Sequence, residues 1–244
     1  MNRGSKLVKP IKKAEQIEIK YNNKHWKLLK DLRTKTIQIM NSLEMNNIQS
    51  IVHGSIARGD VSITSDIDVF LPIICSSFNI EMALESSGLK IDQRAIIQAT
   101  PLYAIKGYIE LDNQSNISFP LVKLRSVEKG FFRFGGEASL NELRNDKRNT
   151  GVDKRLMLIE PTRKGHIETA VIGQEELVAN ILGVSHSTVL DRVHAICRRD
   201  KIGRTGVFIK KELEQNETFE QAMKKLADNN PAVRRRIKFY QNRQ

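Results

Sequence analysis

The chain has little of what marks a secreted or membrane protein. Its 244 residues include two cysteines, Cys75 and Cys197, which lie far apart and outside any Cys-x-x-Cys pair. This spacing excludes a disulfide framework and a cysteine-based zinc site. No run of 18 apolar residues occurs, and the first ten residues lack the apolar segment of a secretory signal. We therefore expect a cytoplasmic protein with no membrane partner.

The common nucleotide-binding loops are also missing. The sequence contains no Gly-x-x-x-x-Gly-Lys-Ser/Thr loop and no Gly-x-Gly-x-x-Gly run, which excludes the P-loop and dinucleotide-binding classes. The five histidines are scattered without metal-ligand spacing, and His53 is interpreted as a packed residue at a strand end. Any chemistry must therefore come from other residues.

Positive charge is in excess and is gathered at the two ends. Forty Lys and Arg residues oppose 28 Asp and Glu residues, a net charge of +12. Residues 1–30 carry +7 and residues 192–244 carry +8, so the middle of the chain carries −3. Basic flanks attract polyanions such as DNA or RNA, although a solvated basic surface that keeps the protein soluble gives the same pattern.

Hydrophobic periodicity predicts an α+β fold with a mixed sheet and a smaller helical C-terminal domain. A three-to-four spacing of apolar residues predicts a helix over 14–45, and residues 79–88 favour another. Short β-branched runs predict strands at 48–52, 66–71, 89–97, 103–111 and 117–124. The expected domains are a basic arm (1–13), a body (14–164) and a helix-rich basic region (165–244).

The segment from His53 to Phe70 carries the most chemical information. Asp66 and Asp68 are two residues apart on a predicted strand, so both carboxylates leave one face, with α-carbons roughly 7 Å apart. Two such carboxylates suit Mg²⁺, which prefers oxygen ligands and keeps positions for water and phosphate. Gly54 lets the backbone approach a phosphate, and Ser55 offers a hydroxyl donor. Arg58 either adds charge against the phosphates or pairs with the nearby Asp60.

This pattern resembles the DNA polymerase β-type nucleotidyltransferase superfamily. The run Gly-Ser-x-Ala-Arg-Gly at 54–59 followed by Ser-Asp-x-Asp at 65–68 is similar to its minimal nucleotidyltransferases and to archaeal nucleotidyltransferase-domain proteins. The resemblance implies transfer of a nucleoside monophosphate from an NTP, ATP being expected, to a hydroxyl acceptor with release of pyrophosphate. Asp66 and Asp68 would be the catalytic Mg²⁺ ligands, and Gly54, Ser55 and Arg58 would hold the nucleotide. The acceptor stays open between RNA, a protein side chain and a small molecule.

The sequence departs from the family at its third carboxylate. The family places that acid on a later hairpin strand, where this chain has Ile117 or Ser118. Glu110, Asp112 and Asp92 are the candidate replacements. Loss of the acid leaves nucleotide binding better supported than turnover, so the alternative is a DNA-binding regulator whose nucleotidyltransferase domain is inactive or senses nucleotide.

The C-terminal region is typical of a winged helix-turn-helix. Residues 175–193 fit two helices, with Gly183 in the turn and Ser185 as N-cap of the second. Residues 198–209 resemble the wing. In this reading, nucleic-acid phosphates are held by Arg198, Arg199, Lys201 and Arg204.

Two further segments have alternative interpretations. Phe131–Gly136 favours the core of a hairpin over a surface that stacks on bases. The basic run at 234–238 predicts a helix that serves either as a phosphate patch or as a solvated tail.

Overall fold

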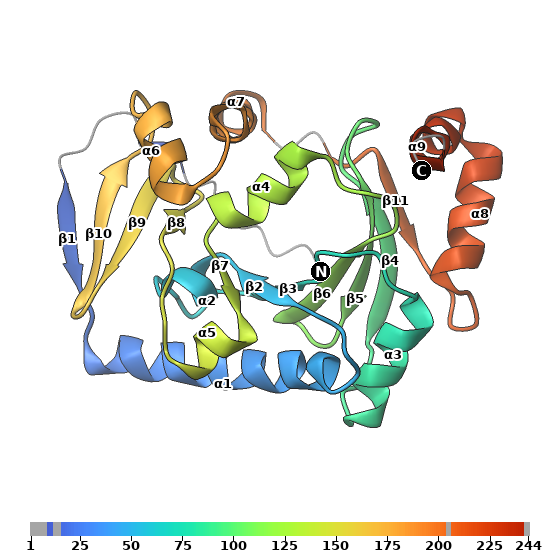
Figure 1. The fold of residues 1–244 in the computed structure, drawn as a ribbon, viewed down its shortest axis with the longest axis horizontal. Helices are drawn as coiled ribbons and strands as arrows, with labels where there is room; N and C mark the ends of the chain where they lie inside the picture. Colours follow the sequence, from blue (N-terminus) through green and yellow to red (C-terminus); the bar gives the residue numbers. More distant parts are fainter. Residues whose placement is uncertain (1–8, 12–15, 204–205, 242–244) are drawn as a thin grey trace.

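The structure, a computed structural model, describes residues 9–11, 16–203 and 206–241, and side chains only up to residue 237 at the C-terminal end. Its described strands form two sheets, one of seven strands and one of four, surrounded by helices (Figure 1). In the larger sheet β3 pairs parallel with β6, and the other neighbours are antiparallel. The predicted α+β class with a mixed sheet is therefore confirmed.

The larger sheet has the strand order β11-β4-β5-β6-β3-β2-β7. In chain order its strands are β2 (Ile51–His53), β3 (Ile67–Phe70), β4 (Gln93–Gln98), β5 (Ile105–Glu110), β6 (Ser115–Pro120), β7 (Glu137–Ser139) and β11 (Ile209–Glu212). The strands predicted at 48–52, 66–71, 89–97, 103–111 and 117–124 all appear, with ends shifted by a few residues. These strands could be predicted because each is a short apolar run that is bounded by turn residues and buried in the core of the sheet.

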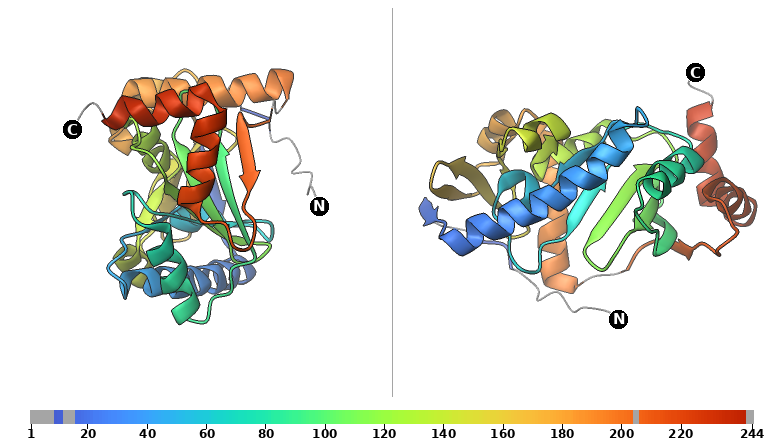
Figure 2. Two further views of the ribbon diagram at one scale, coloured as in Figure 1. Left: turned by 90° about the vertical axis from the view of Figure 1, so that its right-hand side faces the viewer. Right: turned by 90° about the horizontal axis from the view of Figure 1, so that it is seen from below.

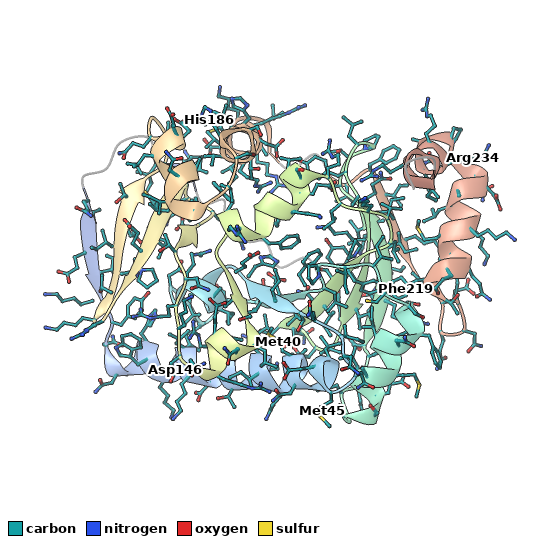
Figure 3. All side chains as sticks on the ribbon, viewed as in Figure 1. Met40, Met45, Asp146, His186, Phe219 and Arg234 are labelled. Carbon is teal, nitrogen blue, oxygen red and sulfur yellow. The ribbon has the colours of Figure 1, made fainter. Side chains whose placement is uncertain are left out.

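One face of the larger sheet is covered by α1 (Asn23–Glu44), α3 (Ser77–Ser86) and α5 (Leu140–Arg144) (Figure 1). The buried stripe of α1 includes Leu32, Ile39 and Met40, and Met40 lies between α1 and the sheet in Figure 3. Each fully buried side chain of this size contributes about 1.5–3 kcal/mol. This apolar layer holds the strands that carry the candidate site.

Helix α1 begins later than predicted. Its N-cap is Asn22, whose side chain accepts a hydrogen bond from the backbone N–H of His25 at 2.9 Å. Residues Ile17–Lys20 instead form strand β1, which pairs with β10. The helix prediction from residue 14 was therefore wrong before Asn23, because pairing with a distant strand outweighs the local pattern. Residues 12–15 lie outside the described part of the chain.

The opposite face of the larger sheet lies below α4 (Ser126–Phe134) and α7 (His186–Ile202) (Figure 1). The ring of Phe132 on α4 stacks on that of Phe70 on β3, with centroids 3.6 Å apart. The prediction that residues 131–136 form the core of a hairpin was wrong, because residues 131–134 are the last residues of helix α4. The sequence shows no helical period at this point, because Phe131 and Phe132 are adjacent and directly follow Gly130.

The smaller sheet has the order β1-β10-β9-β8 and lies beside α2 (Ser55–Arg58) and α6 (Glu175–Leu182) (Figure 1). Its other strands are β8 (Gly151–Val152), β9 (Met157–Thr162) and β10 (Gly165–Ala170). The boundary expected at residue 165 falls within the antiparallel pair of β9 and β10. The smaller sheet therefore joins residues from both sides of that expected boundary.

The last strand and the last two helices of the chain also pack against the body. Strand β11 pairs with β4 at the edge of the larger sheet. Helices α8 (Phe219–Asn229) and α9 (Pro231–Gln241) stand beyond that edge (Figure 2). Phe219 is fully buried between α8 and the sheet, with its ring edge-on to Phe119 at 5.0 Å (Figure 3). Residues after 209 thus share the hydrophobic core of the larger sheet.

Among the described residues, no helix has the length and apolar character needed to cross a bilayer.

Candidate active site

The turn after β2 depends on the backbone freedom of Gly54. Its φ is +83° and its ψ is −145°, a combination that favours glycine. A Cβ added to Gly54 would meet no atom within 4 Å, so the backbone conformation and not crowding requires glycine here. The Gly54 N–H donates to the Gly136 carbonyl at 2.9 Å, which fixes the turn against β7. The space in front of Gly54 is thus open.

Ser55 connects this turn to the acidic strand. Its hydroxyl donates to the hydroxyl oxygen of Ser65 at 3.0 Å. Ser65 also accepts a hydrogen bond from the backbone N–H of Ser62 at 2.9 Å, so the loop that enters β3 is fixed from within. Because Ser65 directly precedes Asp66, the structure brings both halves of the predicted motif to one end of β2 and β3.

Asp68 is the second residue of β3, and Asp66 directly precedes the strand. Ile67 and Val69 are fully buried in the core, so strand alternation places Asp66 and Asp68 on the other face. Asp66 is exposed and Asp68 is half-buried. Asp68 Oδ1 accepts a hydrogen bond from Asn116 Nδ2 at 2.6 Å. One carboxylate oxygen of Asp68 is therefore already oriented by a neighbouring amide.

A polar row crosses the sheet at this level. Asp68 is the register partner of His53 on β2 and of Asn116 on β6, and Asn116 is in turn the partner of Glu110 on β5. Register partners project from the same face. The residue beside Asp68 is therefore Asn116 rather than Ile117 or Ser118, the positions expected from sequence. A carboxamide lies next to Asp68, and the exposed Glu110 follows one strand further on.

The other two candidate acids are placed differently. The carboxylate of Asp112 contacts Lys35 at 2.7 Å and accepts the backbone N–H groups of Gln114 and Ser115. Although partial burial opposes it, these contacts hold the pKa of Asp112 below its usual value. Asp92 is exposed ahead of β4, where its N–H donates to the Glu110 carbonyl. Of the three candidates, Glu110 alone belongs to the row that contains Asp68.

His53 is a packed residue, as the sequence indicated. Its ring meets the edges of Phe131 and Phe132, at 5.9 and 5.1 Å between centroids. Burial lowers the pKa of His53 to about 4, against the opposing attraction of Asp68. His53 is therefore neutral near pH 7 and adds no positive charge beside the aspartates.

Arg58 takes the second of its two predicted roles. It is 5% exposed, and its guanidinium contacts both carboxylate oxygens of Asp60 at 3.0 and 2.8 Å. It also donates to the Gly135 carbonyl at 2.5 Å. From α1, Arg33 donates to the carbonyls of Ile56 and Ala57 at the end of α2. These two arginines hold the α2 turn in place.

The C-terminal helix pair forms at the predicted residues. Gly183 ends α6 with φ +61°, and Ser185 caps α7 by accepting the N–H of Thr188 at 3.2 Å. The predicted wing is not formed by residues 198–202, which are the last turns of α7. On α7, Asp191 accepts a hydrogen bond from the Tyr103 hydroxyl of the body at 2.7 Å.

The predicted phosphate-binding cations lie at the end of α7. Arg198, Arg199 and Lys201 are exposed there, and Arg204 lies outside the described residues. In the basic run at 234–238, Arg234 and Arg235 are exposed on α9, whereas Arg236 is buried and donates to the Lys123 carbonyl. The helix is therefore partly packed onto the body.

The carboxylate pair has the donor chemistry for Mg²⁺. In the described ranges no group of three or more His, Cys, Asp or Glu side chains could hold a metal ion. Two carboxylates leave most of the octahedral coordination sphere of Mg²⁺ to water and phosphate, which suits an ion that arrives with a nucleotide. They do not suit a closed, permanently occupied metal site.

The sequence motif includes Ser65 without indicating its contact with Ser55, and Asn116 was not among the expected site residues. Ser65 stands next to Asp66 and was open to a local argument. Asn116 comes to Asp68 through parallel pairing of strands 48 residues apart, for which the sequence carries no local signal.

No protein-family model matches this chain, and neither a curated protein nor a solved structure matches it.

Proposed function

We propose that the chain is a cytoplasmic Mg²⁺-dependent nucleotidyltransferase that moves a nucleoside monophosphate from an NTP, with ATP as the expected donor, to a hydroxyl acceptor. The observation that carries the proposal is the 3.0 Å hydrogen bond between Ser55 and Ser65. It brings the open Gly54-Ser55 turn to the start of the strand that bears Asp66 and Asp68. A triphosphate held at the turn then lies within reach of both carboxylates.

Each residue has a distinct role in this reaction. Asp66 and Asp68 would hold Mg²⁺, which neutralises the triphosphate charge and favours departure of pyrophosphate. The Ser55 hydroxyl exchanges its bond to Ser65 for one to a phosphate oxygen, and Gly54 leaves space for that phosphate. Arg58 supports the turn from behind through Asp60. Positioning and charge neutralisation supply most of the rate enhancement in such transfers.

The acceptor hydroxyl also needs a proton acceptor. Asn116 is an amide and cannot take up the proton near neutral pH. Glu110, the next residue in the cross-strand row, is exposed and carries a carboxylate on the same face. Glu110 therefore serves as the base that accepts the proton as the new ester bond forms.

Transfer of an α-phosphate label tests the proposal. The protein is incubated with α-³²P-labelled NTPs, Mg²⁺ and pools of RNA, protein and small-molecule acceptors. We expect label transfer that is lost in Asp66→Asn and Asp68→Asn and kept in Asp228→Asn, an exposed aspartate on α8. Transfer that survives in both site variants contradicts the proposal.

A second function is favoured by the amide beside Asp68. Asn116 in place of an acid, together with the α6–α7 pair and the exposed cations at the end of α7, suits a DNA-binding regulator that senses nucleotide. In that case NTP binds without label transfer. DNA binding weakens steeply with salt, and it also weakens when Arg198 and Arg199 are replaced by alanine.

A further inference from the structure

A lysine on the same sheet face as the aspartates has no polar partner among the described residues. The Lys106 ammonium on β5 lies 4.8 Å from the ring centroid of Phe132, 5.2 Å from that of Phe70 and 5.9 Å from that of Phe131. In the described part of the chain Lys106 contacts these three rings, and no carboxylate forms an ion pair with it. Lys106 nevertheless keeps part of its surface exposed.

A second cation contacts the same aromatic group. The guanidinium carbon of Arg192 on α7 lies 4.6 Å from the Phe131 centroid. Its Nε is buried and has no hydrogen-bond partner among the described residues. Arg192 and Phe131 are both half-buried, so each keeps part of its surface exposed. Phe131 therefore has two cations around it.

The nearest carboxylates, those of Asp191 and Glu128, form hydrogen bonds or ion pairs with other groups. Asp191 accepts the Tyr103 hydroxyl at 2.7 Å. Glu128 accepts the Ala104 N–H at 2.5 Å and has Arg125 at 3.3 Å and Arg236 at 3.5 Å. Neither carboxylate is within ion-pair distance of Lys106 or Arg192.

The uncompensated charge points to an anion. Placing a cation in a desolvated environment without a partner is unfavourable, because no protein group replaces the lost hydration. Burial lowers the pKa of Lys106 to about 8, with Glu128 opposing and Arg192 reinforcing the effect. Burial also lowers the pKa of Arg192. A phosphate group, which offers several acceptor oxygens and up to two negative charges, would satisfy both cations.

Lys106 shares a face of the larger sheet with the Asp66-Asp68 site. Lys106 is two residues from Tyr108, whose register partner on β6 is Ser118. Ser118 is the partner of Phe70 on β3, and Phe70 is two residues from Asp68. Side chains at these positions leave one face of the sheet, because residues two apart on a strand and direct register partners point the same way.

We propose that Lys106 and Arg192 bind the phosphate group of a phosphorylated small-molecule acceptor whose hydroxyl reaches the Asp66-Asp68 site. The binding of phosphate stands on the cation pair alone, whereas its role as an acceptor subsite rests on the proposed nucleotidyltransferase function.

Phosphate binding is measured without NTP or Mg²⁺. Isothermal titration follows inorganic phosphate, ribose 5-phosphate and a 5′-phosphorylated single-stranded oligonucleotide into wild type, Lys106→Met and Arg192→Met. The controls are Lys129→Met on α4 and Arg163→Met in the β9–β10 turn, both exposed. We expect the affinity for inorganic phosphate and ribose 5-phosphate to fall about tenfold or more in the two site variants and to stay unchanged in the controls.

A second measurement uses the unmodified chain, so it does not depend on how the variants fold. Ribose 5-phosphate should slow reductive methylation of Lys106, read by mass spectrometry, and should leave the methylation of Lys129 unchanged. Equal affinity in all variants, or no protection of Lys106, overturns the proposal. Lys106-dependent binding of the oligonucleotide that exceeds that of ribose 5-phosphate overturns the small-molecule assignment.

The two proposals can fail separately. Phosphate binding that depends on Lys106 and Arg192, together with no label transfer by the wild-type protein, supports the cation pair and contradicts the enzyme. Label transfer to an unphosphorylated acceptor, with no phosphate binding at Lys106, supports the enzyme and overturns the subsite.

Discussion

Replacement of Asn116 by aspartate examines the electrostatics of the site. The change removes a hydrogen bond of 2.6 Å to Asp68 and puts a second carboxylate in its place. Two unit charges about 4 Å apart repel by about 4 kcal/mol at an effective dielectric constant of about 20. Because Asp68 is only half-buried, solvent reduces this repulsion. We expect Asn116→Asp to lower the free energy of unfolding by about 2–4 kcal/mol near pH 7 without metal.

Two conditions should reverse that loss. Protonation of one carboxylate relieves the repulsion, so the deficit of the variant should shrink as the pH falls toward about 5. Mg²⁺ bound between the carboxylates should stabilise the variant by about 2.7 kcal/mol at a hundredfold excess over its dissociation constant. Urea unfolding in EDTA and in excess Mg²⁺, at both pH values, measures each effect.

The matched control is Asn79→Asp, an exposed residue on α3, which should change stability by less than about 0.5 kcal/mol. If Asn116→Asp is as stable as wild type in EDTA and does not respond to Mg²⁺, the carboxylates do not form the site described here.

Arg58→Met leaves Asp60 without its partner and should cost about 3–5 kcal/mol in urea unfolding; a loss below about 1 kcal/mol contradicts its supporting role. Because the pKa of Lys106 is about 8 in the fold and about 10.4 when unfolded, stability should rise with pH across that interval relative to Lys106→Met, and parallel pH profiles would contradict this. Glu110→Gln should slow label transfer about a hundredfold while Mg²⁺-nucleotide binding is kept, whereas an unchanged rate excludes Glu110 as the base.

Local features of the site were open to prediction from sequence. The Gly54-Ser55 turn, the strand with Asp66 and Asp68, and the cap of α7 at Ser185 each depend on a few consecutive residues. Such segments are determined by neighbouring residues. The relevant effects are the backbone freedom of glycine, the alternation of side chains along a strand and the capping of a helix. The structure therefore forms these elements where the sequence indicated.

Features that depend on distant pairing could not be predicted in the same way. Strand β1 forms because Ile17–Lys20 pairs with β10, which follows about 150 residues later. The local sequence of the same residues is also compatible with a helix. Asn116 reaches Asp68 through the parallel pair β3–β6. The edge strand β11 pairs with β4, so it does not make a wing.

Binding of a non-reactive Mg²⁺–ATP analogue tests the central claim most directly. Calorimetric titration is performed on wild type, Asp66→Asn, Asp68→Asn and the control Asp228→Asn, with and without Mg²⁺. Our account predicts Mg²⁺-dependent binding that weakens about tenfold or more in the two site variants and stays unchanged in the control. Binding of equal strength in all four proteins, or binding that does not depend on Mg²⁺, would contradict it.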